Sequence, residues 1–183
     1  MSRPIKSSED LIKGIEHIRY SVFQLTAMLF WRSMDESKKR VLNRTEFGLL
    51  QNACIESSLL GLRILDEFFT PQSKWDNDMK ALDYGFTEAA SFLKKEAKDK
   101  INTNLAHLSW LRVDNKHAWT YELTISALPA CLAFYKHIIG SYLLQTEVAL
   151  LEEIKQEANQ LNLFLERERN RYPVSIGTSQ FGL

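Results

Sequence analysis

Apolar residues recur along most of the chain at intervals of three and four, and no alternating strand pattern extends beyond a few residues. These intervals keep side chains on one face of an α-helix. The pattern therefore predicts five amphipathic helices, over about residues 9–34, 45–69, 88–111, 117–139 and 145–170. The first helix has the 4-3-4-3-4 spacing of a bundle seam, formed by Leu11, Ile15, Ile18, Val22, Leu25 and Leu29.

Polar residues and prolines predict where the first two helices begin and end. Ser8 is the expected N-cap of the first helix, and Asn43 or Thr45 is the expected cap of the second. The polar run of residues 35–40 is expected to be a connection between them. Pro71 is expected to stop the second helix, because proline cannot continue the hydrogen-bond ladder.

The rest of the chain carries similar signals. Residues 72–87 predict a loop with a short helical turn. Pro129 is expected to kink the fourth helix, because proline removes a backbone donor, and Gly140 is expected to end it. Residues 171–183 contain a proline and a glycine and predict a mobile C-terminal tail.

Each apolar stripe needs a partner to bury against, and short links make consecutive helices neighbours. The expected fold class is therefore all-α, with a single antiparallel bundle of about five helices over residues 1–170, followed by the tail of residues 171–183. The first, second and last helices have wide apolar faces, which leaves room for the seam of a homodimer.

Composition narrows the function classes. Lysine plus arginine and aspartate plus glutamate both number 23 in 183 residues, so nucleic-acid binding would depend on a local patch. The N-terminus lacks the apolar core of a secretory signal, and no uncharged apolar run of about 18 residues occurs. A cytoplasmic protein without membrane contact is therefore predicted. Cys54 and Cys131 lie in apolar helical patterns, and both are expected to be buried free thiols.

The segment of residues 98–112 concentrates polar chemistry at the end of the third predicted helix. Lys100 and His107 lie seven residues apart and about 20° from each other around a helix, with Asn104 between them. Asn102 adds a second amide nearby. A cation, amides and an imidazole could meet one ligand on this face. The alternative is that His107 caps the last carbonyls of its helix or bonds a neighbouring helix.

Two arginines extend this candidate site. Arg63 precedes Asp66 by three residues and Glu67 by four, so an intrahelical ion pair is expected on a solvated stripe. The other interpretation has Arg63 reaching across to the histidine face. Arg112 follows Trp110 near a predicted turn, where an aromatic ring and a cation either contact nucleic acid or close the end of the bundle.

Two short helical elements carry a further pattern, formed by Glu56, Leu59, Arg63, Leu65, Asp66 and Phe69, then Lys100, Ile101, Asn102, Leu105, Ala106, His107 and Leu108. The pattern resembles that of uncharacterised bacterial helical proteins with a HEPN-like arrangement, over about residues 10–140. The resemblance implies a helical bundle that dimerises. Many such proteins are metal-independent ribonucleases whose signature is an arginine, four to six residues, then a histidine.

The resemblance places His107 on the family's histidine, which would move protons on and off the ribose hydroxyl and the leaving oxygen. Asn102 falls at the arginine position, with Lys100 as the nearest cation. The family's arginine stabilises the negatively charged phosphorane, and an amide cannot supply that charge. Lys100 could replace it only as a point charge.

These observations lead to a HEPN-like helical interaction module, non-catalytic or weakly catalytic, with RNA or a nucleotide as candidate ligand at the Lys100/His107 face. Asn102, Asn104, Arg63 and Arg112 are the expected binding residues. A homodimer partner is expected, and a partner protein is a further candidate. The alternative is a metal-independent endoribonuclease of toxin or phage-defence type, with His107 as general acid–base and Lys100 beside it. A purely structural bundle is a third possibility, and whether the chain is an enzyme stays open. No cofactor and no metal site are predicted, since the histidines share no ligand spacing.

Overall fold

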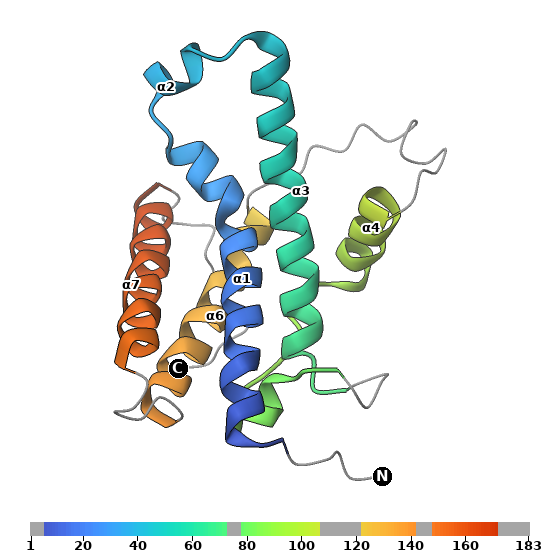
Figure 1. The fold of residues 1–183 in the computed structure, drawn as a ribbon. Helices are drawn as coiled ribbons and strands as arrows, with labels where there is room; N and C mark the ends of the chain where they lie inside the picture. Colours follow the sequence, from blue (N-terminus) through green and yellow to red (C-terminus); the bar gives the residue numbers. More distant parts are fainter. Residues whose placement is uncertain (1–5, 73–77, 107–121, 142–147, 172–183) are drawn as a thin grey trace. The chain divides into compact units, whose positions relative to one another are not determined.

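The computed structural model describes residues 6–72, 78–106, 122–141 and 148–171. Over these ranges the chain forms α-helices, one short 3-10 helix and no strand, so the predicted all-α class is confirmed (Figure 1). The elements are α1 (Ser8–Ser33), α2 (Glu36–Arg40), α3 (Arg44–Phe69), the 3-10 helix η1 (Ala81–Tyr84), α4 (Lys95–Ala106), α6 (Glu122–Ser141) and α7 (Val148–Arg171).

The chain divides into two compact units, residues 1–127 and 128–183. The first unit holds α1 to α4 and residues 122–127 of α6, and the second holds the rest of α6 together with α7. A single domain over residues 1–170 stays a prediction. The helix α7 continues to Arg171, and the rest of the expected tail lies outside the described residues.

An antiparallel pair of long helices, α1 and α3, forms the core of the first unit (Figure 1). Gly61 lets the two backbones approach closely: a Cβ atom there would lie 2.5 Å from Leu25 N and 2.6 Å from Ser21 O. The buried Ser58 hydroxyl accepts a hydrogen bond from Met28 N at 2.9 Å across the same contact. Apolar side chains fill the seam on both sides, including Ile15, Leu25, Leu62 and Leu65.

The N-terminal caps fall within a residue of their predicted places. Ser7, not Ser8, caps α1, with its hydroxyl accepting from Asp10 N at 3.1 Å. Asn43 caps α3 in a capping box with Glu46, as one of the two predicted alternatives had it. The polar run of residues 35–40 connects α1 to α3 as predicted, and it contains the short helix α2. Asp35 starts α2 there by accepting from Ser37 N at 2.9 Å.

The segment between α3 and α4 is partly as predicted. A short helical turn, η1, lies within the expected loop, and its end is fixed by Gly85, whose φ of 71° favours glycine. The buried Tyr84 hydroxyl donates to Leu11 O at 3.0 Å, which ties η1 to α1. The third helix was predicted from about residue 88, but α4 begins at Lys95. The backbone N–H groups of Phe92 and Leu93, just before it, donate to the Asp66 side chain on α3 instead.

In the second unit, the Tyr135 hydroxyl donates to Glu157 Oε2 at 2.9 Å, joining α6 to α7.

Of the two cysteines, Cys131 on α6 is buried as predicted, whereas Cys54 on α3 is only half-buried. Gly140 does not end the helix as predicted, because α6 runs on to Ser141 with Pro129 inside it. Glycine weakens a helix by about 1 kcal/mol relative to alanine, which burial of the other residues can offset.

Among the described helices, α6 is long and apolar enough to cross a membrane, over Leu123–Gly140 with a mean hydropathy of 1.3. The core helices of soluble proteins pass the same test, and 56% of this window is buried. The absence of membrane contact and the cytoplasmic location stay predictions.

Candidate functional site

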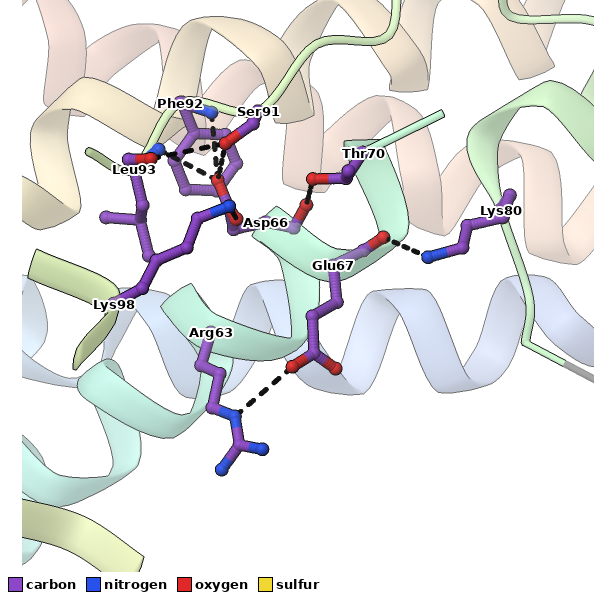
Figure 2. A network of polar contacts seen from close by, with 9 residues as sticks. All are labelled: Arg63, Asp66, Glu67, Thr70, Lys80, Ser91, Phe92, Leu93 and Lys98. Carbon is purple, nitrogen blue, oxygen red and sulfur yellow. Dashed lines mark hydrogen bonds and ion pairs between the residues drawn. The ribbon is translucent and has the colours of Figure 1, made fainter. Parts of the chain in front are cut away.

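The last turn of α3 holds a buried carboxylate that organises the chain around it (Figure 2). One oxygen of Asp66, Oδ1, accepts three hydrogen bonds: from Ser91 Oγ at 2.9 Å, Phe92 N at 2.9 Å and Leu93 N at 2.8 Å. Two backbone donors that a helix could have used are therefore committed to Asp66. This explains why α4 starts later than the sequence pattern predicts.

The second oxygen of Asp66 forms an ion pair with Lys98, Oδ2 to Nζ at 2.6 Å. The Asp66 side chain is 2% exposed and the Lys98 side chain is 35% exposed, so the pair reaches from the interior to the surface. One carboxylate thus joins three parts of the chain: the end of α3, the segment leading to α4, and α4 itself. Burial of a carboxylate is tolerated when it is paired and hydrogen-bonded in this way.

Arg63 lies one turn earlier on α3 and pairs with Glu67, Nε to Oε1 at 3.3 Å (Figure 2). The predicted intrahelical ion pair is therefore confirmed, with Glu67 rather than Asp66 as the partner. The Arg63 side chain is partly exposed and the Glu67 side chain more so. The approach of Arg63 to the His107 face stays a prediction, since His107 lies outside the described residues.

Two further contacts complete the end of α3. The Thr70 hydroxyl donates to Asp66 O at 2.7 Å, and the buried Lys80 ammonium donates to Glu67 O at 2.6 Å. Asp66 O also accepts from Thr70 N at 3.0 Å, so the hydroxyl is a second donor to that carbonyl. The carbonyls at the end of a helix carry partial negative charge, which the Lys80 cation stabilises at Glu67 O. Sequence reasoning missed Lys80, because its position before η1 gives no local signal of this contact.

A small pocket opens between α3 and α4, with a volume of about 30 Å³. A cavity of this size holds a water molecule or a group no larger than a few atoms. The buried Asn102 Oδ1 has no hydrogen-bond partner among the described residues. An unsatisfied buried acceptor costs about 1–3 kcal/mol, so this atom calls for a donor. The pocket is lined by Arg63, Asp66, Glu67, Leu93, Lys98, Ile101 and Asn102.

The pocket brings together Arg63 and Asn102, two of the residues that the sequence singled out. Lys100 is half-buried on α4 and does not line it. Residues two apart lie about 200° from each other around a helix, so Asn102 and Lys100 face different ways. Asn104 belongs to α4, but the structure does not describe its side chain. His107 and Arg112 lie outside the described residues. The predicted site residues thus divide between a pocket and a separate Lys100 face.

The charges around the pocket balance. Arg63 pairs with Glu67 and Lys98 pairs with Asp66, so each cation already has a carboxylate. Within the ranges that the structure describes, no group of three or more His, Cys, Asp or Glu side chains could hold a metal ion. The arrangement can position a neutral donor group at Asn102, but it offers little uncompensated charge.

Comparisons with protein-family models, with curated proteins and with solved structures find no match.

Proposed function

We propose that this protein is a HEPN-like helical interaction module that binds RNA or a nucleotide at the Lys100/His107 face without efficient cleavage, and that it works as a homodimer. The observation that carries the non-catalytic part is the surroundings of Asn102. This residue stands where the family resemblance expects an arginine, and the two cations beside it are paired with carboxylates. A developing phosphorane would find no uncompensated positive charge from these residues.

The binding part rests on the Lys100 face. Asn102 takes the pocket side of α4, which leaves Lys100 on the side that the sequence pattern assigns to His107. A lysine beside an imidazole can hold a phosphate while the imidazole donates a hydrogen bond. Because contact with phosphates releases counterions, the affinity for single-stranded RNA falls with salt, with a slope of about 0.7 for each phosphate contacted.

Anisotropy of a fluorescent single-stranded RNA at several salt concentrations tests this proposal. We expect binding by the wild type, and Lys100→Gln should weaken it and lower the salt slope by about 0.7. Lys94→Gln is the matched control, since Lys94 is an exposed lysine that immediately precedes α4. No binding by the wild type would contradict the proposal, and equal losses in both variants would contradict the Lys100 face.

A further inference from the structure

A second apolar stripe runs along α1, on the side away from its core. It is formed by Tyr20, Phe23, Ala27 and Phe30, whose 3-4-3 spacing places them on one face, and Met34 at the C-cap follows four residues later. This outer stripe is centred about 140° around the helix from the buried seam of α1. Tyr20 is 62% exposed, Phe23 63% and Phe30 45%, and the rings of Phe23 and Phe30 lie 6.4 Å apart.

The same face has a different composition near the start of α1. Glu9, Lys13 and Glu16 continue the spacing of the outer stripe toward the N-terminus, and all three are exposed. Lys13 and Glu9 form a surface ion pair there, at 2.6 Å. A face that meets only water is expected to be polar along its whole length. The change from charged to aromatic residues on one face marks the later part as a contact surface.

The area of the outer stripe matches what a small dimer needs. With about 200 Å² for an aromatic side chain, its three rings leave about 340 Å² in water on each copy. Two copies would bury about 680 Å² of ring surface. Since about 57% of a typical interface is non-polar, the whole contact would reach about 1,200 Å², the lower limit for a specific interface.

We propose that a second copy of this chain covers the outer stripe, with the two α1 helices antiparallel and the two-fold axis near Ala27. This inference deepens the homodimer of the proposed function and rests on it. The spacing is self-complementary: Tyr20 of one copy faces Met34 of the other, and Phe23 faces Phe30. The small side chain at the centre lets the helices approach. The carboxylates of Glu9 and Glu16 on the same face disfavour an anionic membrane surface as the occupant.

Sedimentation velocity of the whole chain between about 1 and 100 μM tests the surface, a range that resolves micromolar affinities. The wild type should dimerise, and Phe23→Glu should raise its dissociation constant at least about 100-fold, because each interface would bury two unpaired carboxylates. Leu49→Glu is the matched control on α3, since Leu49 is 65% exposed and lies off the outer stripe. This variant should remain dimeric.

A cross-link tests the two-fold axis. In a Cys54→Ser background, Ala27→Cys should form a disulfide between copies under mild oxidation, because the axis brings the two residues together. Ala53→Cys, at an exposed position on α3, should not. Equal cross-linking of both variants would overturn the assignment.

The remaining outcomes separate this inference from the proposed function. A dimer that survives Phe23→Glu overturns the surface but leaves the homodimer. A monomeric wild type overturns both. If another segment of the chain then covers the stripe, Phe23→Glu should have a lower melting temperature. If lipid covers it, the protein should co-sediment with phosphatidylcholine vesicles. RNA binding, measured on the same samples, decides the ligand independently of the dimer.

Discussion

Replacing Asp66 by asparagine changes one charge at the point where three segments meet. The amide keeps the size of the side chain and can keep an oxygen facing Ser91, Phe92 and Leu93. It cannot keep the ion pair with Lys98, because two donors would then face each other. Lys98 is partly exposed and can turn into solvent, so no buried cation is left behind.

The magnitude follows from the contacts. A hydrogen bond to a charged acceptor contributes about 1.5–3 kcal/mol and one to a neutral acceptor about 0.5–1.5, so three bonds lose about 3 kcal/mol together. The half-exposed ion pair adds at most about 1 kcal/mol. The lower cost of burying an amide than a carboxylate offsets part of this loss. Asp66→Asn should therefore lower the free energy of unfolding by about 2–3 kcal/mol, and Asp66→Ala, which leaves two backbone N–H groups without an acceptor, by about 3–5.

Urea denaturation followed by circular dichroism measures these values. Glu67→Gln is the control: it removes a neighbouring carboxylate whose ion pair with Arg63 is exposed, and it should cost no more than about 0.5 kcal/mol. Amide exchange at Phe92 and Leu93 should accelerate in Asp66→Asn. Equal stability of Asp66→Asn and Glu67→Gln would refute the view that Asp66 organises this part of the fold.

Four further predictions concern the core, the thiols and the pocket. Gly61→Ala should cost about 1–3 kcal/mol, because its Cβ would meet the α1 backbone. Gly48→Ala should stabilise by about 0.5–1 kcal/mol, because its Cβ would meet no atom within 4 Å from the described residues outside its own turn of helix, and urea denaturation compares the two variants. Burial raises the pKa of Cys131 to about 12 and also raises that of Cys54, so a thiol reagent at pH 8 should label the half-buried Cys54 before Cys131. Because the pKa of Cys131 is raised above 9.0, stability from its neutral thiol is present below pH 9.0 and is lost as pH rises toward 12, which melting curves would reveal. Asn102→Arg should lower the free energy of unfolding by about 1–3 kcal/mol, because it forces a longer, charged side chain into the small pocket beside Arg63 and Lys98. The variant should not cleave RNA, and a gain of RNA cleavage would contradict the prediction.

Features set by neighbouring residues could be predicted from the sequence. The cap at Asn43, the end of α3 before Pro71 and the Arg63–Glu67 pair all depend on residues within four positions of each other. The start of α4 could not be predicted, because Asp66 takes the amides of Phe92 and Leu93 from 26 and 27 residues away. Local helix propensity favoured an earlier start, and a long-range contact overrode it.

The candidate site was predictable in part for the same reason. Arg63 and Asn102 stood out as polar residues in helical patterns, and both line the pocket. The pairing of Asp66 with Lys98 was not foreseen, because a closer arginine offered itself as the partner. The sequence predicted a wide apolar face on the first helix, but not its division into a core stripe and a separate outer stripe. Its 3-4 spacing matches that of the core stripe, and only burial distinguishes the two.

The proposed binding of RNA without efficient cleavage can be tested in one experiment. The most direct measurement incubates labelled single-stranded RNA with the wild type in EDTA, at protein concentrations that saturate anisotropy, and resolves the RNA on a denaturing gel. We expect bound and intact RNA with the wild type, and the same result with His107→Ala. Cleavage by the wild type that is lost in His107→Ala would contradict the proposal, since loss of a general acid–base lowers the rate about 10²–10⁴-fold, and would establish the endoribonuclease instead.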